Sequence, residues 1–325
     1  MSTQPRKHHY VPQGYLRIFS YKNNDHYKIK VFDKISQSFY FSNIENVAAQ
    51  RDYNRDITKE DEFFWEKYFA TTVEATIPHV LGNIIAASNL ASNCSVILND
   101  DLKLQLSKII ITQLLRTPTM RSRNKSIAHQ SREQVLKNFK KEYYKILSPH
   151  QKQLINNLRF DDENYKSFEL SFINDPKRLD KFTHFLLQRY WVVYRNPFSH
   201  FIPFITSDHP VNFYNYSKHS EKIGDSGLAV DDTVINYPIC NNLLLCLYTP
   251  THWMQCTQQF NNCVVDLNEN EKNYWYIIQT NQLQYLNAYR QVFYKSDDDR
   301  MLKLCFECYN SKKVCKRQTR GWHTC

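Results

Sequence analysis

Two short stretches of the sequence concentrate side chains that could do chemistry. The first reads KHHYVPQGYLR from Lys7 to Arg17, and the second reads PFITSDHPV from Pro203 to Val211. In the first, His8 and His9 carry imidazoles, which can ligate a metal ion or act as a general base near neutral pH. Arg17 adds a permanent positive charge with a fork of donors that suits phosphate or carboxylate. We therefore expect this stretch to contribute to a catalytic site.

The second stretch places a carboxylate after an apolar segment. A strand is expected over residues 201–206, so Asp208 should emerge at its end, where metal-binding and basic carboxylates often lie, with Ser207 beside it. Asn287 and Arg290 are three residues apart on a later helix, and they could add a pair of donors from one face. These four residues complete the candidate catalytic set.

We predict that one of the two histidines meets Asp208 in one pocket. Arg17 should lie within reach of the same cavity. A carboxylate, an imidazole and a guanidinium at the rim of a sheet could hold a divalent metal ion, position water and neutralise a phosphate. A structural role stays open for both stretches. The histidine pair could anchor the start of the chain through hydrogen bonds, and a Ser-Asp dipeptide shortly before a proline is typical of a turn.

The two stretches resemble the signature of a family of mostly microbial proteins, domain of unknown function 4238 (DUF4238). Its members begin with a His-His-Tyr-Val-Pro run, followed by Tyr-Leu-Arg and an aromatic residue, which is Phe19 here. The Ser-Asp-x-Pro motif that starts at Ser207 is similar to a later motif of the family, and so are the segments 114–118 and 237–239. The resemblance spans residues 5–295. It implies no activity, so a functional hypothesis must come from the side chains themselves.

Positive charge is concentrated in the middle of the chain. The net charge is +10, and residues 116–159 carry eleven Lys or Arg against two Glu, a net +9. Such a segment favours a polyanionic partner, because binding releases counterions, although a solvated helix face is the alternative. The side chains expected to contact nucleic acid are Arg116, Arg121, Arg123, Lys137, Lys140, Lys141 and Lys145.

Within this segment, residues 131–147 form an amphipathic pattern. At helical spacing the four lysines from Lys137 to Lys145 share one face. The opposite face carries Val135, Phe139, Tyr143 and Ile146.

Glycine is scarce, and this scarcity excludes several enzyme classes. The chain has five glycines, of which only Gly224 and Gly227 lie within six residues of each other. Phosphate-binding loops of the P-loop and dinucleotide type, and the nucleophile elbow of hydrolases, need closely spaced glycines in patterns that are missing here. The acid-x-Lys strand that PD-(D/E)xK nucleases need after their aspartate is missing beyond Asp208 as well. No window approaches the ~18 apolar residues of a membrane span.

Eight of the nine cysteines lie after residue 239. Since no apolar segment of a secretory signal follows the first residues, we expect a cytoplasmic protein with reduced thiols. A Cys-x-x-Cys pair followed by further Cys and His residues could bind zinc, although the spacing is irregular and free thiols are the alternative. The residues concerned are Cys305, Cys308, Cys315, His323 and Cys325.

The periodicity predicts an α+β fold with the order β, α, β, α. A β-hairpin is expected over residues 25–42, a central helical bundle over about 58–190, a mixed or antiparallel sheet over about 190–265, and a C-terminal helix over 268–294. A capping box at Thr58 should begin a helix with apolar residues spaced by three and four from Phe69 to Ile84, which Pro78 kinks. A central, buried helix should begin at Asp100 or Asp101, and Ser148 with Gln151 should form a further capping box. We predict one domain over residues 1–295, with the bundle as a subdomain, and a basic, Cys-rich tail over 296–325.

Two functions follow from these features. The first is an enzyme of the phosphodiesterase or nuclease type that acts on nucleic acid or a nucleotide, with a divalent metal ion as a possible aid and a microbial defence or toxin-type role. The second is a non-catalytic nucleic-acid-binding protein that uses the basic segment 116–159. Convergence of the histidines with Asp208 in a concave pocket would favour the first.

Overall fold

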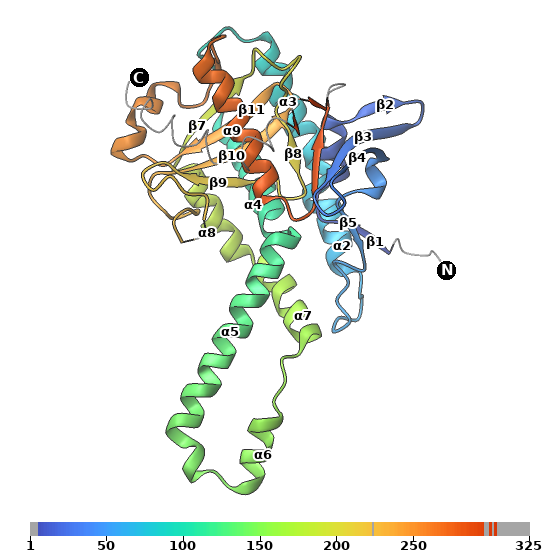
Figure 1. Cartoon of the computed structure of the whole chain (residues 1–325), viewed down its shortest axis with the longest axis vertical. Coiled ribbons are helices and arrows are strands. Elements are labelled where there is room, and N and C mark those ends of the chain that lie inside the picture. The colour runs from blue at the N-terminus through green and yellow to red at the C-terminus, as the bar shows by residue number, and fades with distance from the viewer. Residues whose placement is uncertain (1–5, 223, 296–298, 301, 304–325) are drawn as a thin grey trace.

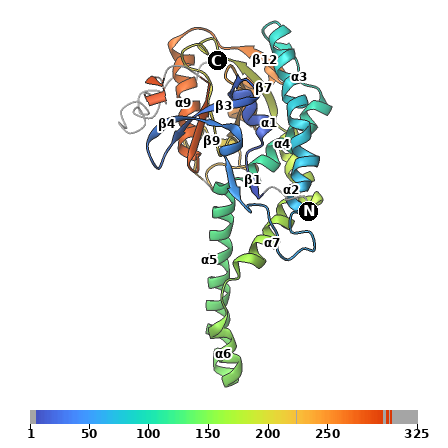
Figure 2. The same ribbon diagram turned by 90° about the vertical axis from the view of Figure 1, so that its right-hand side faces the viewer.

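The computed structural model describes residues 6–222, 224–295, 299–300 and 302–303 (Figure 1). Its architecture confirms the predicted α+β fold. A body of sheets and helices carries one long helical arm (Figures 1 and 2). Within the described residues, none of the helices combines the length and apolar composition that a membrane span needs.

The larger sheet of the body is mixed. Its strands follow the spatial order β6-β12-β7-β11-β10-β9, in which β12 and β7 pair in parallel and the other neighbours are antiparallel. Alternate residues of each strand face opposite sides, which gives two core clusters: one side packs against α3, α4 and α8, and the other against α9. The strands are β6 (Ser95–Val96), β7 (Tyr190–Arg195), β9 (Asn212–Asn215), β10 (Thr233–Cys240), β11 (Leu243–Tyr248) and β12 (Cys263–Asp266).

A second sheet is built from the N-terminal hairpin and two later strands. The predicted hairpin is confirmed, since β3 and β4 pair in antiparallel register across the polar turn 34–37. The order β2-β3-β13-β8 then joins the hairpin to segments more than 160 residues later in the chain. The strands are β2 (Tyr21–Asn23), β3 (His26–Asp33), β4 (Ser38–Asn43), β8 (Thr206–Ser207) and β13 (Gln291–Tyr294), and a separate pair is formed by β1 (Lys7–His9) and β5 (Ala49–Arg51).

The prediction of a strand over residues 201–206 is wrong except at its last residue. Only Thr206 and Ser207 are in a strand, although Ile205 and its apolar neighbours are buried. Pro203 cannot donate to a sheet ladder, and the amide of Asn281 binds this segment instead: its Oδ1 accepts from the N–H of Ile205 (3.1 Å) and its Nδ2 donates to the carbonyl of Pro203 (2.9 Å). The segment is therefore buried without belonging to a strand.

The helices fall into those of the body and those of the arm. The predicted central helix is confirmed as α4, which is buried on several faces and is capped by Asn99, whose Oδ1 accepts from the N–H of Leu102 (2.8 Å). The body helices are α1 (Gln13–Leu16), α2 (Phe64–Tyr68), α3 (Ile77–Leu90), α4 (Asp100–Arg116), α8 (Pro176–Leu187) and α9 (Glu271–Asn287), and the arm helices are α5 (Pro118–Tyr143), α6 (Pro149–Asn157) and α7 (Asp162–Ile173).

The helix predicted from Thr58 begins later than expected. The hydroxyl of Thr58 donates to Asp56 Oδ1 (2.7 Å) inside a turn, and α2 begins at Phe64. Pro78 kinks no helix, because it occupies the first turn of α3, where its missing N–H costs nothing. The apolar spacing is present, but it runs from a π-helical turn (Phe69–Val73) into α3 and not along one helix.

The arm departs from the predicted bundle. Figure 2 shows α5 leaving the body, α6 at the far end and α7 returning beside α5. None of the side chains from residue 122 to residue 168 is buried. The capping box predicted at α6 is present, with Ser148 and Gln151 bonded to each other's backbone N–H groups. Local signals therefore form these helices, while tertiary packing contributes little to the arm.

Candidate functional site

The two histidines lie on β1 and face different neighbours. His8 is fully buried; its Nδ1 accepts from the N–H of Asn54 (2.9 Å) and lies 3.7 Å from Glu66 Oε2. An accepting Nδ1 requires the tautomer that carries its proton on Nε2. His9 is nearly buried beside Gln13, whose Nε2 lies 3.4 Å from His9 Nδ1, and burial lowers the pKa of His9. Both imidazoles are therefore neutral groups within the fold near pH 7.

Arg116 holds this stretch in place from the end of α4. Its guanidinium is fully buried and donates to the carbonyls of Tyr10 (3.0 Å) and His9 (2.8 Å) and to Glu74 Oε1 (2.7 Å). It also lies over the ring of Phe69, 4.9 Å from its centroid. Arg116 was predicted to contact nucleic acid; that prediction is wrong, because a buried guanidinium bonded to the chain cannot reach a phosphate.

Arg121 requires the same correction. It is buried, and it donates to the carbonyl of Tyr53 (2.9 Å) and to Asn54 Oδ1 (2.8 Å) while its guanidinium stacks over the ring of Tyr53. Because Asn54 in turn donates to His8, Arg121 supports the histidine stretch from its other side. Arg123, two residues further along α5, is half-buried, and burial lowers its pKa.

Asp208 is fully buried and binds the turn that joins α9 to β13. Its two carboxylate oxygens accept from three consecutive backbone N–H groups, those of Tyr289 (2.7 Å), Arg290 (2.7 Å) and Gln291 (2.8 Å). Burial raises the pKa of Asp208 to about 6, and the three N–H donors oppose that rise. A carboxylate with this many internal donors fixes a turn.

Two more side chains from the β3–β4 turn hold the same connection. Lys34 donates to the carbonyls of Tyr285 (2.8 Å) and Ala288 (2.8 Å) at the end of α9, where its charge suits the helix dipole. Asp33 accepts from Arg290 Nε (2.6 Å). Burial alone would raise the pKa of Asp33, but hydrogen bonds, among them the one from Arg290, outweigh it and lower that pKa. Arg290 is thus half-exposed and paired.

The remaining residues of the candidate set also have internal partners. The hydroxyl of Ser207 donates to Gln284 Oε1 (2.8 Å), and Asn287 donates to the carbonyl of Leu283 (3.0 Å). His209, which the candidate set omitted, is buried with Nδ1 2.7 Å from the hydroxyl of Thr117, and burial lowers its pKa to about 4. The dense spacing of polar residues in 206–209 is the signal that could have pointed to this buried network.

The predicted meeting of the histidines, Asp208 and Arg17 finds no geometric support in these contacts. Arg17 is exposed and lies over the ring of Tyr27, 4.7 Å from its centroid. The N-terminal stretch approaches Asp208 through Tyr10 instead: burial raises the pKa of Tyr10, and the charge of Asp208 adds to that rise. The catalytic roles of these residues stay predictions.

No described group of three or more His, Cys, Asp or Glu side chains is placed to hold a metal ion. The zinc site predicted from Cys305, Cys308, Cys315, His323 and Cys325 lies outside the described residues. The described cysteines, which are Cys94, Cys240, Cys246, Cys256 and Cys263, are free thiols.

The exposed positive charge lies on the arm. Lys137, Lys141 and Lys145 are exposed on α5 and the turn after it, and Lys140 is half-buried; none of the four has an ion-pair partner among the described residues. Elsewhere on the arm, Lys125 pairs with Asp162 (2.9 Å). With the two buried arginines removed, residues 122–159 still carry nine Lys or Arg against two Glu, a net +7.

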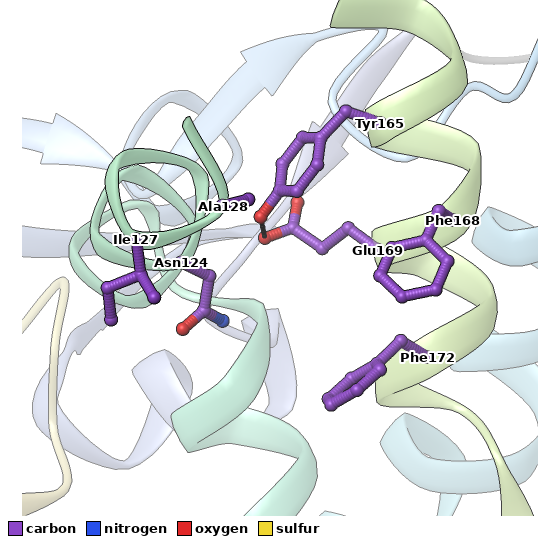
Figure 3. Close-up of a pocket in the computed structure, with 7 residues that line it drawn as sticks. All are labelled: Asn124, Ile127, Ala128, Tyr165, Phe168, Glu169 and Phe172. Carbon is purple, nitrogen blue, oxygen red and sulfur yellow. Dashed lines mark hydrogen bonds between the residues drawn. The ribbon is translucent and has the colours of Figure 1, made fainter. Parts of the chain in front are cut away.

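An apolar pocket of about 200 Å³ lies at the base of the arm between α5 and α7 (Figure 3). Glu169 lies at its wall, where the hydroxyl of Tyr165 donates to Glu169 Oε1 (3.4 Å) and burial raises the pKa of the Glu169 carboxyl. Aromatic rings dominate the side contributed by α7. The lining residues are Asn124, Ile127, Ala128, Tyr165, Phe168, Glu169 and Phe172.

The chain matches the model of a family described as "Protein of unknown function (DUF4238)" over residues 7–298, which confirms the resemblance seen in the sequence motifs. The match includes both polar stretches and the whole arm. No curated protein and no solved structure matches the chain.

Proposed function

The chain belongs to the DUF4238 family of proteins of unknown function, and from its geometry we propose that it binds nucleic acid without cleaving it. One observation carries this proposal: four lysines of a protruding arm, Lys137, Lys140, Lys141 and Lys145, have no acidic partner among the described residues. Unpaired ammonium groups on a projecting helix are free to replace the counterions of a phosphate backbone.

The spacing of these lysines suits a backbone rather than a base. Lys137, Lys141 and Lys145 follow one another at four residues, about 6 Å of rise per step along a helix, so they form a row on one side of the arm. Lysine is a compact point charge that contacts phosphate without reading sequence. We therefore expect binding that depends steeply on salt and weakly on sequence.

A phosphodiesterase activity stays a prediction, and the contacts of the predicted catalytic groups favour it less. His8 uses Nδ1 as an acceptor inside the fold, and both oxygens of Asp208 are bonded to backbone N–H groups. Incubating the purified protein with labelled RNA and DNA, with and without Mg²⁺ or Mn²⁺, tests this alternative. Cleavage that is lost in Asp208→Asn, in a protein that stays folded, would replace binding by catalysis as the function.

The binding proposal is tested by removing the four charges while keeping the helix. Glutamine has good helix propensity, so Lys→Gln at positions 137, 140, 141 and 145 should leave α5 intact. Fluorescence anisotropy with a random 30-nucleotide strand and a random duplex should show at least a tenfold loss of affinity at low salt. The slope of log K against log salt should fall by about 3 to 4.

A matched control removes the same charge elsewhere. Lys22, Lys28, Lys177 and Lys181 are exposed on the body and have no ion pair among the described residues. Replacing these four by Gln should change affinity by less than about twofold, beyond the long-range effect of net charge. Equal losses in the two variants, or no salt-sensitive binding by the unmodified protein, would refute a nucleic-acid site on the arm.

A further inference from the structure

The arm carries a row of large apolar side chains that nothing in the described chain covers. Val135 is 65% exposed, Phe139 38% and Tyr143 46%, and Ile146 in the following turn is 80% exposed. A long helix in a folded protein normally owes its stability to packing of such a face, and a contiguous exposed apolar row marks an interaction surface. This face therefore needs an occupant.

The row lies beside the returning segment and not against it. Tyr144 at the end of α5 accepts a hydrogen bond from Asn156 of α6 (2.9 Å), and the ring of His129 lies 5.3 Å from that of Phe160. On this side of α5 the half-buried residues follow at four-residue steps: Leu136, Lys140 and Tyr144. Val135, Phe139 and Tyr143 each precede one of these residues by one position, a rotation of about 100° around the helix. The apolar row therefore points away from the returning segment and stays uncovered.

We infer that the open face binds the same face of a second copy of this chain, with the two α5 helices antiparallel about a two-fold axis at residue 137. Residues equally far on either side of position 137 then lie opposite each other. Val135 meets Phe139 of the second copy. Arg132, which is half-buried at the edge of the open face and pairs with the neighbouring Glu133 within one chain (2.8 Å), meets Glu142 of the second copy. Each contact occurs twice, as a two-fold axis requires. An apolar pair and an ion pair thus come from one register.

Helix geometry places these positions on one face. At 100° per residue, Arg132, Val135, Phe139 and Glu142 fall within a sector roughly 80° wide, and so does Ala128. The middle lysine, Lys137, points to the opposite side of the helix. Pairing through this sector therefore keeps the like charges of the two arms apart, on the outer surface of the dimer.

The pocket at the base of the arm supplies the third contact. The same register puts Ile146 of the second copy opposite Ala128, whose small side chain lines the pocket together with Phe168 and Phe172 of α7 (Figure 3). Ile146 is the most exposed large apolar side chain of the arm, and the pocket is about 200 Å³ of apolar space. A large side chain thus faces a small one over a cavity at both ends of the paired helices, which is how interlocking packing is achieved.

Charge reversal tests the pairing on the full-length protein. Sedimentation or light scattering over a concentration series should show a dimer. Arg132→Glu and Glu142→Arg should each weaken it by about tenfold, because each creates two like-charge contacts. The double variant restores opposite charges and should return the dissociation constant to within about threefold of the unmodified value. The control Ile35→Asp replaces an exposed apolar residue of the body and should have no effect.

Cysteine cross-linking tests the register. A chain with Ala128→Cys mixed with a chain with Ile146→Cys should form a disulfide that joins these two positions, as identified by peptide mass spectrometry. A mixture of Val135→Cys and Ile146→Cys chains should not, since the register separates these positions by seven residues, about 10 Å of helix. Peptide mapping also separates these products from disulfides of the exposed Cys94.

Three results would overturn the inference. One is a protein that stays monomeric at its highest soluble concentration. Another is a dimer that the double charge swap does not restore or that gives no 128–146 cross-link. The third is a monomer that binds anionic vesicles of phosphatidylserine and phosphatidylcholine through Val135 and Phe139, which would make a lipid surface the occupant. Because no lysine of the nucleic-acid proposal takes part in the pairing, the two proposals can fail separately.

Discussion

The turn around Asp208 and the arm beyond Arg121 use charged side chains in opposite ways. In the body, Asp208 and Arg116 are fully buried, and each binds backbone groups of segments distant in sequence. On the arm, lysines such as Lys141 point into solvent without an acidic partner, and no side chain between residues 122 and 168 is buried. A charged residue therefore says nothing by itself about function; what it binds decides whether it holds the fold or faces a ligand.

The difference also explains why the polar stretches are dense. A buried carboxylate is tolerated only when donors surround it, so Asp208 requires the turn 289–291 and a lysine at position 34 nearby. The lysines of α5 are in contact with solvent and need no internal partners, and apolar residues such as Phe139 and Ile146 lie beside them. In the body a dense polar stretch is the mark of a buried network, whereas on α5 the charges lie at the exposed surface.

The largest expected effect comes from replacing Asp208 by Asn. Two of its three N–H donors, those of Arg290 and Gln291, bind the same oxygen, so the Asn amide should keep its oxygen there and turn its NH₂ group toward the N–H of Tyr289. One buried donor then lacks an acceptor and two hydrogen bonds lose their ionised acceptor, which together should lower the free energy of unfolding by about 4 kcal/mol, measured by urea denaturation. The control Asp25→Asn, at an exposed hairpin position, should change it by less than about 0.5 kcal/mol. A variant as stable as the unmodified protein would contradict the structural role of Asp208.

How far the sequence predicts this molecule depends on the range of the interactions involved. The β3–β4 hairpin, the buried helix α4 and the cap at Ser148 arise from neighbours within a few residues, and each was predicted. Arg116 was misassigned because its partners lie 42 to 107 residues away, so counting charges along the chain could not separate it from Lys137. The family was predicted from spaced motifs, but a motif does not reveal whether Asp208 binds substrate or backbone.

The arm shows the same limit for apolar residues. Periodicity correctly placed Val135, Phe139 and Tyr143 on one side of a helix, and such a face usually packs on the body. Here α5 is long enough to leave the body, so the same pattern produces an exposed row. Only the three-dimensional course of α5 and α7 distinguishes the two cases.

An intermediate effect is expected from the pH dependence of a His209→Gln variant. Burial lowers the pKa of His209 to about 4, below its ordinary value near 6.5 in an unfolded chain. Its contribution to stability is therefore fully present above pH 6.5 and is lost as the pH falls toward 4. The free energy of unfolding that the substitution costs should therefore be smaller at pH 4 than at pH 7, by up to about 3 kcal/mol.

Chemical denaturation at pH 7, 5.5 and 4 measures this difference directly. Asp208 titrates in the opposite sense, since its raised pKa favours the folded protein at low pH, but it is present in both proteins and cancels in the comparison. A His129→Gln variant, altered at an exposed position of the arm, is the control for replacing a histidine by glutamine. A constant difference between His209→Gln and the unmodified protein across this pH range would mean that the pKa of His209 is not lowered in the fold.

The smallest effect on stability is expected from removing the outer arm altogether. The rings of His129 and Phe160 lie 5.3 Å apart, so residues 131–159 can be replaced by a short Gly-Ser linker without moving the ends. Because no buried side chain is removed, the free energy of unfolding should change by less than about 1 kcal/mol at low protein concentration. By contrast, Leu106→Ala in the core should cost about 2 to 5 kcal/mol and shows that the assay responds.

Protein concentration sharpens this last comparison. If arms pair, the unmodified protein gains stability as its concentration rises, whereas the shortened protein has no arm to pair and should not. When thermal unfolding is measured at two concentrations a hundredfold apart, only the unmodified protein should have a higher midpoint at the higher concentration. A loss of several kcal/mol on shortening at low concentration would show instead that the arm stabilises the body within one chain. The body would then depend on the arm, which would contradict the contrast drawn between the two regions.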